Sequence, residues 1–318
     1  MTETMKTYHW SGTVAADDAN CSIHSWLRER MGFTRRFLRR VKVTGILLRN
    51  GNRDYWNLLV AAGDYIELEW KEQLADIQLN HDRRGNHSDL ILDIIAQDDD
   101  LCVVNKPSGM LVHPVKSERI NTALDILQRE QPTISFRPVN RIDRETSGIV
   151  LFSKHVLAHQ KLSEQFVERS ASKVYLAWVC GEVPCESVLN ELPIVKDHDH
   201  AVRRFVCRGE VIPEEAQQAS TMIRGIRSIE LPNVGIISLV EAKPLTGRTH
   251  QIRVHLSAMG TPILGDVLYG GMIIPNIAER ILLHASELRV LHPLTKQERC
   301  WHAELPDDMN LFMKLTID

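Results

Sequence analysis

Alternation of apolar and polar positions predicts several strands along this chain, because the side chains of a half-buried strand point in turn to the core and to solvent. Residues 65–70 alternate in this way after a Gly-Asp turn, and residues 172–184 place Lys173, Tyr175 and Ala177 on one face. Continuous apolar runs flanked by turn residues predict more deeply buried strands. These runs cover residues 90–95, 101–104 and 148–152.

Apolar residues at helical spacing predict two short helices within residues 22–52. Ser22 can cap the first helix and Gly32 can end it, while Thr34 can cap the second. The second helix would turn its arginines outward and three apolar side chains inward. The inward residues are Phe37, Leu38 and Val41. The Asn-Gly pair that follows at 50–51 predicts a hairpin.

Two further segments are predicted to be helical. Asn121 can cap a helix over residues 122–130. Residues 249–260 fit both a strand and a helix, since their polar residues alternate with apolar ones while other pairs fall at helical spacing. We favour a helix that Thr249 caps and Gly260 ends, which places Arg253 in its first turns.

Composition indicates a globular protein. The chain has 318 residues, of which 43% are hydrophobic and 25% charged, enough for one large core or two smaller ones. No apolar run approaches the ~20 residues that a membrane-spanning helix needs, and residues 1–10 lack an apolar signal core. We therefore expect a cytoplasmic protein with no membrane partner. Six scattered cysteines without a CxxC pair indicate neither a zinc site nor a disulfide framework.

Two polar stretches contain histidines that could be considered as metal ligands. His81 and His87 lie near Asp82, and His198 and His200 lie near the start of the segment 196–204. Neither stretch has a further ligand at fixed spacing, so polar turns are the better interpretation. We expect no metal site and no cofactor.

Positive charge is concentrated near the N-terminus. Nine basic residues stand against two acids between Arg28 and Asp54, although the whole chain has a net charge of −3. Such a block is typical of a surface that binds phosphates, while a solvated helix face is the alternative. The arginines of the second predicted helix are the candidate RNA contacts. They are Arg35, Arg36, Arg39 and Arg40.

Loss of periodicity divides the chain. The polar stretch after residue 71 is the best linker candidate. We therefore predict a small N-terminal domain over residues 1–71, a linker over 72–89 and a second domain over 90–318. In the second domain Asp143 lies between Arg141 and Arg144 and precedes the apolar run 148–152. Loops that feed strands commonly carry catalytic residues.

Five blocks in this second domain carry a family resemblance. In chain order they are NKPSGMLVHP, NRIDRETSGIVLFSK, KVYLAWVCG, GRTHQIRVHLSAMGTPILGDVLYG and LLHASELRVLHPLTKQERCWHAELP. Together they resemble the pseudouridine synthases of the RluA family. Residues 10–70 are similar to the RNA-binding domain of the ribosomal protein S-four type. The two resemblances imply an α/β (α+β) fold, in which a large mixed, mainly antiparallel sheet forms the catalytic domain and a small RNA-binding domain is attached to it.

The family resemblance also implies roles for individual residues. Asp143 would be the catalytic nucleophile, and Arg253 the cation that keeps it ionised in a pocket that excludes water. The planar guanidinium of Arg253 could bind both carboxylate oxygens of Asp143 at once. Tyr175 would stack on the uracil and assist proton transfer. Attack on the anomeric carbon and removal of a proton from the neighbouring sugar carbon both remain open for Asp143.

The resemblance further implies that Arg141 enters the RNA where the target base has left the stack, and that Arg144 contacts phosphate. Surface salt bridges are the alternative for both arginines. The expected partner is ribosomal or transfer RNA, and we expect a monomer.

Two positions depart from the family pattern. Asn140 replaces a histidine that the family usually has, and Gln217 replaces a lysine. A protein that binds RNA without catalysis is therefore an alternative, although it would not need Asp143, Tyr175 and Arg253 together. A hydrolase that uses Asp143 as its nucleophile is a weaker alternative, because no motif for a second, water-activating carboxylate is present.

Overall fold

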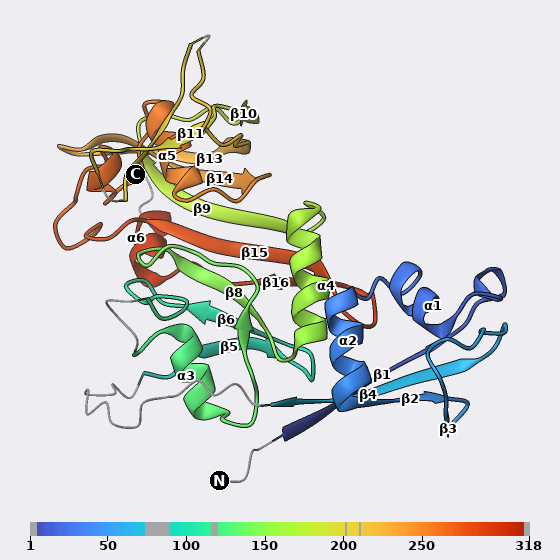
Figure 1. The fold of residues 1–318 in the computed structure, drawn as a ribbon. Coiled ribbons are helices and arrows are strands. Elements are labelled where there is room, and N and C mark those ends of the chain that lie inside the picture. Colours follow the sequence, from blue (N-terminus) through green and yellow to red (C-terminus); the bar gives the residue numbers. More distant parts are fainter. Residues whose placement is uncertain (1–4, 74–89, 116–119, 201, 210, 315–318) are drawn as a thin grey trace.

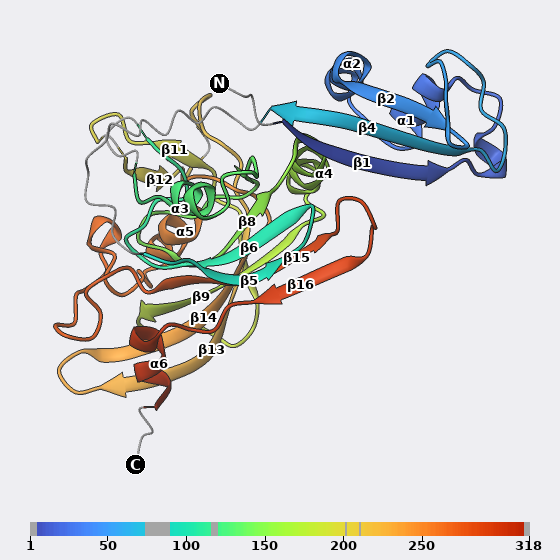
Figure 2. The ribbon, with the colours of Figure 1, turned by 90° about the horizontal axis from the view of Figure 1, so that it is seen from below.

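The computed structural model describes residues 5–73, 90–115, 120–200, 202–209 and 211–314. The predicted linker 72–89 lies mostly outside these ranges, as do His81, Asp82 and His87. Two sheets organise the described residues into a small unit, residues 5–73, and a large unit, residues 90–314. Figure 2 shows the small unit projecting from one side of the large sheet, next to the helix α4 (Val156–Val167).

The small unit is a four-stranded antiparallel sheet with two α-helices and one short 3-10 helix. Its strands follow the order β1-β4-β2-β3. The strands are β1 (Met5–Thr13), β2 (Gly45–Arg49), β3 (Asn52–Arg53) and β4 (Tyr65–Gln73), and the helices are η1 (Ala16–Asp18), α1 (Ile23–Glu29) and α2 (Arg35–Thr44). Asn50 and Gly51 both have positive φ, of 51° and 80°, so the predicted Asn-Gly hairpin turn is confirmed.

Both predicted helix caps in the small unit are confirmed. Ser22 Oγ accepts a hydrogen bond from Ser25 N at 3.1 Å, and Thr34 Oγ1 accepts one from Phe37 N at 3.2 Å. The predicted inward face of α2 is fully buried and packs against Trp70, with the Phe37 and Trp70 rings 5.1 Å apart. Each such apolar side chain contributes about 1.5–3 kcal/mol relative to an exposed one. The helical hydrogen bonds of α1 stop at Glu29, and Gly32 ends the helix as predicted, because its φ of 67° lets Phe33 N donate back to the Leu27 carbonyl at 2.9 Å.

The large unit is built on a ten-stranded, mainly antiparallel sheet, as the family resemblance implied. Its strands follow the order β10-β13-β14-β9-β15-β8-β6-β5, with β16 paired to β15 and β7 to β8. They are β5 (Asp93–Gln97), β6 (Leu101–Lys106), β7 (Arg137–Pro138), β8 (Ser147–Ser153), β9 (Ser172–Cys180), β10 (Val188–Asn190), β13 (Thr221–Leu231), β14 (Gly235–Pro244), β15 (Leu283–Leu291) and β16 (Glu298–His302).

A smaller two-stranded sheet and several helices complete the large unit (Figure 1). The sheet consists of β11 (Ile194–Lys196) and β12 (Arg204–Val206), and the helices are α3 (Ala123–Glu130), α4, α5 (Gln251–Ala258), η2 (Val267–Tyr269) and α6 (Asp307–Lys314). No helix among the described residues is long and apolar enough to cross a membrane.

Strand β8 lies inside the large sheet, between β15 and β6, and every one of its residues is buried. It runs antiparallel to β6 but parallel to β15, where Gly148 stands opposite Ala285. Gly148 has a φ of 109°, and a Cβ on it would lie 2.3 Å from the carbonyl oxygen of Ala285. Only glycine fits this close approach, which fixes the strand directly after the Asp143 loop.

Two predicted helix starts are wrong by one residue. Thr122, not Asn121, caps α3 through a bond from Asp125 N at 3.2 Å, while Asn121 adopts a positive φ of 58° and donates its N–H to the Asp125 carboxylate. The segment 249–260 is a helix, as we favoured, but His250 rather than Thr249 occupies its N-cap. The helix ends before Gly260, which has a φ of 81°.

Helix α4 holds the small unit against the large one (Figure 1). Leu157 of α4 belongs to the apolar core of the small unit. Lys161 of α4 donates to the carbonyls of Met31 and Gly32 at 2.6 Å each. The Tyr8 hydroxyl donates to the carbonyl of Lys154 at 3.0 Å.

A buried carboxylate strengthens this contact. Glu72, at the end of β4, accepts from the first backbone N–H of α4 at 2.9 Å and from Arg137 at 3.3 Å. A negative charge at a helix N-terminus is favourable, and Glu72 is 3% exposed. Because Arg137 begins the segment that leads to Asp143, the small unit is in contact with the chain that carries the site.

Acid should destabilise the large unit through His284. Its ring faces the Ser147 hydroxyl at 2.9 Å and the Ala303 carbonyl at 3.2 Å, and burial lowers its pKa to about 4. In the unfolded chain the His284 ring binds a proton near pH 6.5, whereas in the folded protein it does so only near pH 4. The free energy of unfolding should therefore fall as the pH drops from about 6.5 to 4, and His284 should account for on the order of 3 kcal/mol of this loss.

Urea unfolding of wild type and His284→Gln at several pH values checks this prediction. The variant should be less stable at pH 7.5 but lose less stability on acidification. His302→Gln, an exposed site, should keep the wild-type slope. Parallel curves for wild type and His284→Gln would contradict the prediction.

Candidate active site

The loop between β7 and β8 carries Asp143, and the Lys-Pro-Ser-Gly turn after β6 holds this loop in place. Lys106 is completely buried and donates to the carbonyls of Pro107, Met110 and Arg144 at 2.8, 2.8 and 3.0 Å. Burial lowers the pKa of Lys106 to about 7, with Glu145 and Asp143 acting in the opposite direction. Three carbonyl acceptors match the three N–H donors of an ammonium group, so we take the charged form as the one present.

Two further bonds join the same segments. The Gly109 N–H donates to the Arg144 carbonyl at 2.9 Å, and the Ser108 hydroxyl donates to the Glu145 carbonyl at 2.6 Å. The turn after β6 therefore holds the backbone that directly follows Asp143.

Asn140, which departs from the family pattern, fixes the other side of the loop. Its Oδ1 accepts from Leu151 N at 2.7 Å, and its Nδ2 donates to the Ile149 carbonyl at 3.4 Å. These bonds attach the residue to the buried strand β8. Asn140 therefore positions the loop through its amide group, without the histidine ring that the family usually has at this position.

Arg253 projects from α5 and binds two carboxylates. Its Nη1 lies 3.2 Å from Asp143 Oδ2, while its Nε and Nη2 donate to Asp266 at 2.7 and 2.9 Å. The planar fork is therefore used by Asp266, and the expectation that it binds both oxygens of Asp143 is wrong. Asp266 has a side chain only 1% exposed, whereas that of Asp143 is 30% exposed. Burial opposes the charge of Arg253, but the two carboxylates raise its pKa.

Helix α5 positions Arg253 by burying polar residues that satisfy one another. His255 is bonded to Thr221 Oγ1 at 2.9 Å and to the Leu192 carbonyl at 3.0 Å. Gln251 accepts from Thr246 and donates to Thr221. Buried polar groups with complete hydrogen bonding rigidify their surroundings, and this explains why periodicity alone left the segment ambiguous.

Tyr175 lies in β9, opposite Ala285, which in turn pairs with Gly148. Its side chain is 8% exposed, and its hydroxyl has no hydrogen-bond partner within the described ranges. Burial raises the pKa of Tyr175, and the negative charge of Asp143 raises it further. The phenol is therefore protonated at neutral pH and within electrostatic range of the acid.

The predicted catalytic residues thus gather from three parts of the chain. The sheet register places Tyr175 on β9, across β15 from Gly148 near the start of β8, which Asp143 precedes. Helix α5 brings Arg253 to the acid. The second carboxylate, Asp266, has both oxygens on Arg253. An accessible, ion-paired carboxylate beside a buried phenol can act as a nucleophile or as a base, without a second carboxylate free to activate water.

The predicted RNA-contacting arginines are all exposed. Arg141 and Arg144 flank Asp143 on its loop. Burial is the main cause that lowers the pKa of His113, and the positive charge of Arg141 lowers it further. The four arginines of α2 have no ion-pair partner in the described part of the chain. They are Arg35, Arg36, Arg39 and Arg40.

Sequence reasoning missed four residues around the acid. Lys106, His250, Asp266 and Tyr269 lie within the quoted motifs but received no role. His250 Nε2 is 3.8 Å from Asp143 Oδ2, and the Arg253 guanidinium lies 5.0 Å from the centre of the Tyr269 ring. The signal that could have found them is their position as polar residues inside otherwise apolar motifs.

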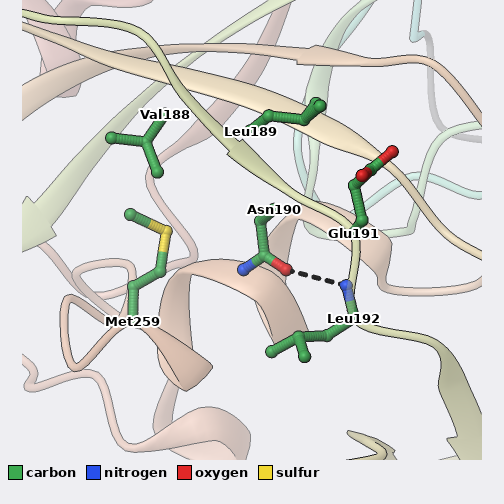
Figure 3. A pocket seen from close by; sticks show the side chains of 6 residues that line it. All are labelled: Val188, Leu189, Asn190, Glu191, Leu192 and Met259. Carbon is green, nitrogen blue, oxygen red and sulfur yellow. Dashed lines mark hydrogen bonds between the residues drawn. The ribbon is translucent and has the colours of Figure 1, made fainter.

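A hollow of about 380 Å³ lies away from these residues, between the edge strand β10 and the end of α5 (Figure 3). Met259 faces Val188 across it, and Asn190 Oδ1 accepts from Leu192 N at 3.1 Å. None of the predicted site residues lines this hollow.

Two groups of side chains have the composition of a metal site. Glu287, Cys300 and His302 lie together on the β15–β16 hairpin. In the other group, His292 Nδ1 accepts from Thr295 N at 3.1 Å, so its Nε2 carries the proton and donates to Asp98 at 3.1 Å. Neither group includes a residue of the site around Asp143.

Comparison with known proteins shows the family of this chain. A model of the RNA pseudouridylate synthase family matches residues 100–258. The chain is 33% identical over 257 residues to YhcT of Bacillus subtilis (strain 168), an uncharacterized RNA pseudouridine synthase, with 80% of this chain and 79% of that protein covered. It is 36% identical over 202 residues to the dual-specificity RNA pseudouridine synthase RluA of Vibrio parahaemolyticus, with 63% and 78% covered.

Two more similarities extend this result. The ribosomal large subunit pseudouridine synthase D of Zymomonas mobilis is 32% identical over 256 residues, which cover 76% of this chain and 78% of that protein. The structure of human RNA pseudouridylate synthase domain containing 1 superposes with a TM-score of 0.55 at 26% identity, over 70% of this chain and 94% of that one. The chain therefore belongs to the RluA-type RNA pseudouridine synthases and is an RNA-modifying isomerase.

Proposed function

We propose that this enzyme converts specific uridines of large-subunit ribosomal RNA to pseudouridine, with transfer RNA as the alternative substrate, and that Asp143 is its nucleophile. The substrate class is supported by two relatives, one a dual-specificity RNA pseudouridine synthase and one a ribosomal large subunit pseudouridine synthase. The observation that carries the assignment of the acid is the 3.2 Å contact between Arg253 Nη1 and Asp143 Oδ2.

Exposure distinguishes the two carboxylates that Arg253 contacts. The reaction breaks the bond between base nitrogen and sugar, turns the uracil and rejoins it through carbon, so the carboxylate has to reach the ribose. Asp143 is 30% exposed, while Asp266 is 1% exposed and fully engaged with Arg253. Asp143 is therefore the reacting acid, and Asp266 orients the arginine. Both the ester route and the glycal route are compatible with this arrangement.

Tyr175 is assigned to the uracil. Its burial supports stacking of the flat base on the phenol ring, and its raised pKa supports a proton donor or acceptor through the neutral hydroxyl. The absence of an internal partner for the hydroxyl within the described residues leaves it available to the substrate.

Arg141 and Arg144 are assigned to the RNA backbone and to the gap that the flipped base leaves. Extruding a base costs a few kcal/mol of stacking and pairing. Arg141 is exposed beside the acid, so it can fill the gap and offset part of this cost.

The small unit is assigned as an RNA-binding domain of the S-four type. Its predicted bounds are residues 1–71 and the predicted linker is 72–89, but β4 continues to Gln73, so we place the start of the linker after that residue. Its two capped helices, its four-stranded sheet and the exposed arginines of α2 support this assignment. We further propose that the protein acts as a monomer in the cytoplasm, where its RNA substrates are found.

Reversing the charge of the α2 arginines should weaken RNA binding and its dependence on salt. Each lost phosphate contact lowers the slope of log K against log [salt] by about 0.7–0.9. We expect the variant with glutamate at positions 35, 36, 39 and 40 to lose up to about three units of slope, while kcat on a short, saturating substrate changes little. Binding titrations at several salt concentrations measure this, with Arg299→Glu as the matched control on β16. An unchanged slope would identify these arginines as a solvated face.

Mapping of pseudouridine in cellular RNA tests the proposed function. RNA should be compared from cells that make the wild-type protein, the Asp143→Asn variant or neither. Sites present only with the wild type would identify the substrate. If both proteins bind the same RNA and no uridine differs between the samples, the second candidate, an RNA-binding protein without catalysis, is correct.

A further inference from the structure

The two oxygens of Asp143 have different surroundings. Arg253 Nη1 lies 3.2 Å from Oδ2, and His250 Nε2 lies 3.8 Å from the same Oδ2. Oδ1 has no hydrogen-bond partner within the described ranges. The closest contacts of both Arg253 and His250 are therefore with Oδ2, and Oδ1 is free of hydrogen bonds to the described residues.

A chain of hydrogen bonds favours one position for the proton of His250. The backbone N–H of Arg204 donates to the Tyr269 hydroxyl oxygen at 2.9 Å, so this oxygen is already an acceptor. Its single O–H can then donate to His250 Nδ1, which lies 2.8 Å away. A neutral imidazole that accepts at Nδ1 carries its proton on Nε2, and Nε2 is the nitrogen near Asp143.

The backbone of His250 has an uncommon conformation. Its φ is 57° and its ψ 18°, in the left-handed region where non-glycine residues are rare and histidine is one of the enriched types. Its side chain forms no cap bond to α5, although Val254 N still donates to the His250 carbonyl at 2.9 Å. The ring is thus directed to Tyr269 and Asp143 instead of to the helix terminus.

The electrostatic surroundings favour the neutral ring. Burial is the largest effect on His250 and lowers its pKa. The charged groups that face it act in both directions, since Arg253 and Arg204 lower the pKa while Asp143 and Asp266 raise it. The side chain of His250 is 12% exposed.

We propose that His250 is a positioning residue which, together with Arg253, binds Oδ2 of Asp143 and so assigns Oδ1 as the oxygen that reacts with the ribose. This rests on Asp143 being the nucleophile. The distance of 3.8 Å is longer than a hydrogen bond, and catalytic contacts of this kind often shorten when substrate binds. The Tyr269 hydroxyl supports this role, because its hydrogen bond to Nδ1 keeps the proton of His250 on Nε2.

Nitrogen-15 NMR of histidine-labelled protein at pH 8 tests the tautomer without reference to activity. The signals that disappear in His250→Gln identify His250. In the wild type they should show a protonated Nε2 and an unprotonated Nδ1. In Tyr269→Phe the two tautomers should both be populated. A protonated Nδ1 in the wild type would overturn the proposal.

Kinetics test the role of the contact. His250→Ala should lower kcat by about 10–100-fold with little change in KM, the range in which loss of one positioning contact commonly falls. His250→Gln, whose amide N–H can still reach Oδ2, should recover part of this loss, and His302→Gln serves as the control at an exposed site. Thermal unfolding of each variant reports whether the fold is intact.

The outcomes separate the two proposals. If Asp143→Asn is inactive but a folded His250→Ala keeps the kcat of the wild type, His250 does not position the acid, and the assignment of Asp143 stands. If Asp143→Asn remains active, the proposed function itself is wrong. Equal kcat values for folded His250→Ala and His250→Gln would also contradict the positioning role, because the glutamine would then supply nothing.

Discussion

Asp143→Asn should abolish pseudouridine formation while the fold and RNA binding remain. The amide has the shape of the carboxylate but is neither a nucleophile nor a base, so we expect kcat to fall by at least about 1,000-fold. Arg253 keeps its two bonds to Asp266 in this variant, so no buried charge is left alone and the free energy of unfolding should change by less than about 1 kcal/mol.

Single-turnover assays with saturating enzyme, together with RNA-binding titrations and urea unfolding, measure these three properties. Glu230→Gln is the matched control, because it makes the same chemical change at an exposed position of β13. Turnover by Asp143→Asn above a tenth of the wild-type rate would show that another group carries the reaction.

Arg253→Met should remove nearly all activity and also destabilise the protein. The activity is lost because Asp143 loses its cation. The stability is lost because Asp266, 1% exposed, keeps a buried charge without its two charge-assisted bonds. Leaving one partner of a buried ion pair unpaired costs about 3–5 kcal/mol. Arg253→Lys should retain some activity and stability, since an ammonium keeps the charge but cannot bind two carboxylates in the same geometry.

A double variant separates the two effects. Adding Asp266→Asn to Arg253→Met removes the unpaired charge, so the double variant should regain at least about 2 kcal/mol of the lost stability. It should remain inactive, because Asp143 still lacks its partner. Unfolding free energies and kcat values for the wild type, both single variants and the double variant complete the comparison. Recovery of activity together with stability would mean that Arg253 supports the fold alone.

The two carboxylates that bind Arg253 also explain why a family pattern is not sufficient to describe a site. The resemblance pointed to an ion pair between Arg253 and Asp143, and the two side chains are in contact. It did not indicate that the guanidinium fork belongs to Asp266, thirteen residues further along the chain. The stability prediction for Arg253→Met follows only from this second contact.

Local chemistry made much of the fold predictable. The Ser22 and Thr34 caps, the Asn50–Gly51 turn and the buried run of β8 each depend on neighbours a few residues apart, so their residue types are enough to predict them. The errors at Asn121 and Thr249 concern single cap positions, where two adjacent polar residues compete for the same role and the backbone dihedral angles decide.

Local residue patterns predicted most of the elements and the order of the motifs, and this order indicated the family and its reaction. The tertiary structure was needed to find that Arg253 and His250 contact the same oxygen of Asp143, that the Tyr269 hydroxyl lies 2.8 Å from His250 Nδ1, and that Glu72 joins the small unit to α4. The physical reason is distance along the chain. Asp143 and Arg253 are 110 residues apart, and Glu72 and Val156 are 84 apart. Such contacts depend on the packing of whole elements, which no local pattern of apolar and polar residues encodes.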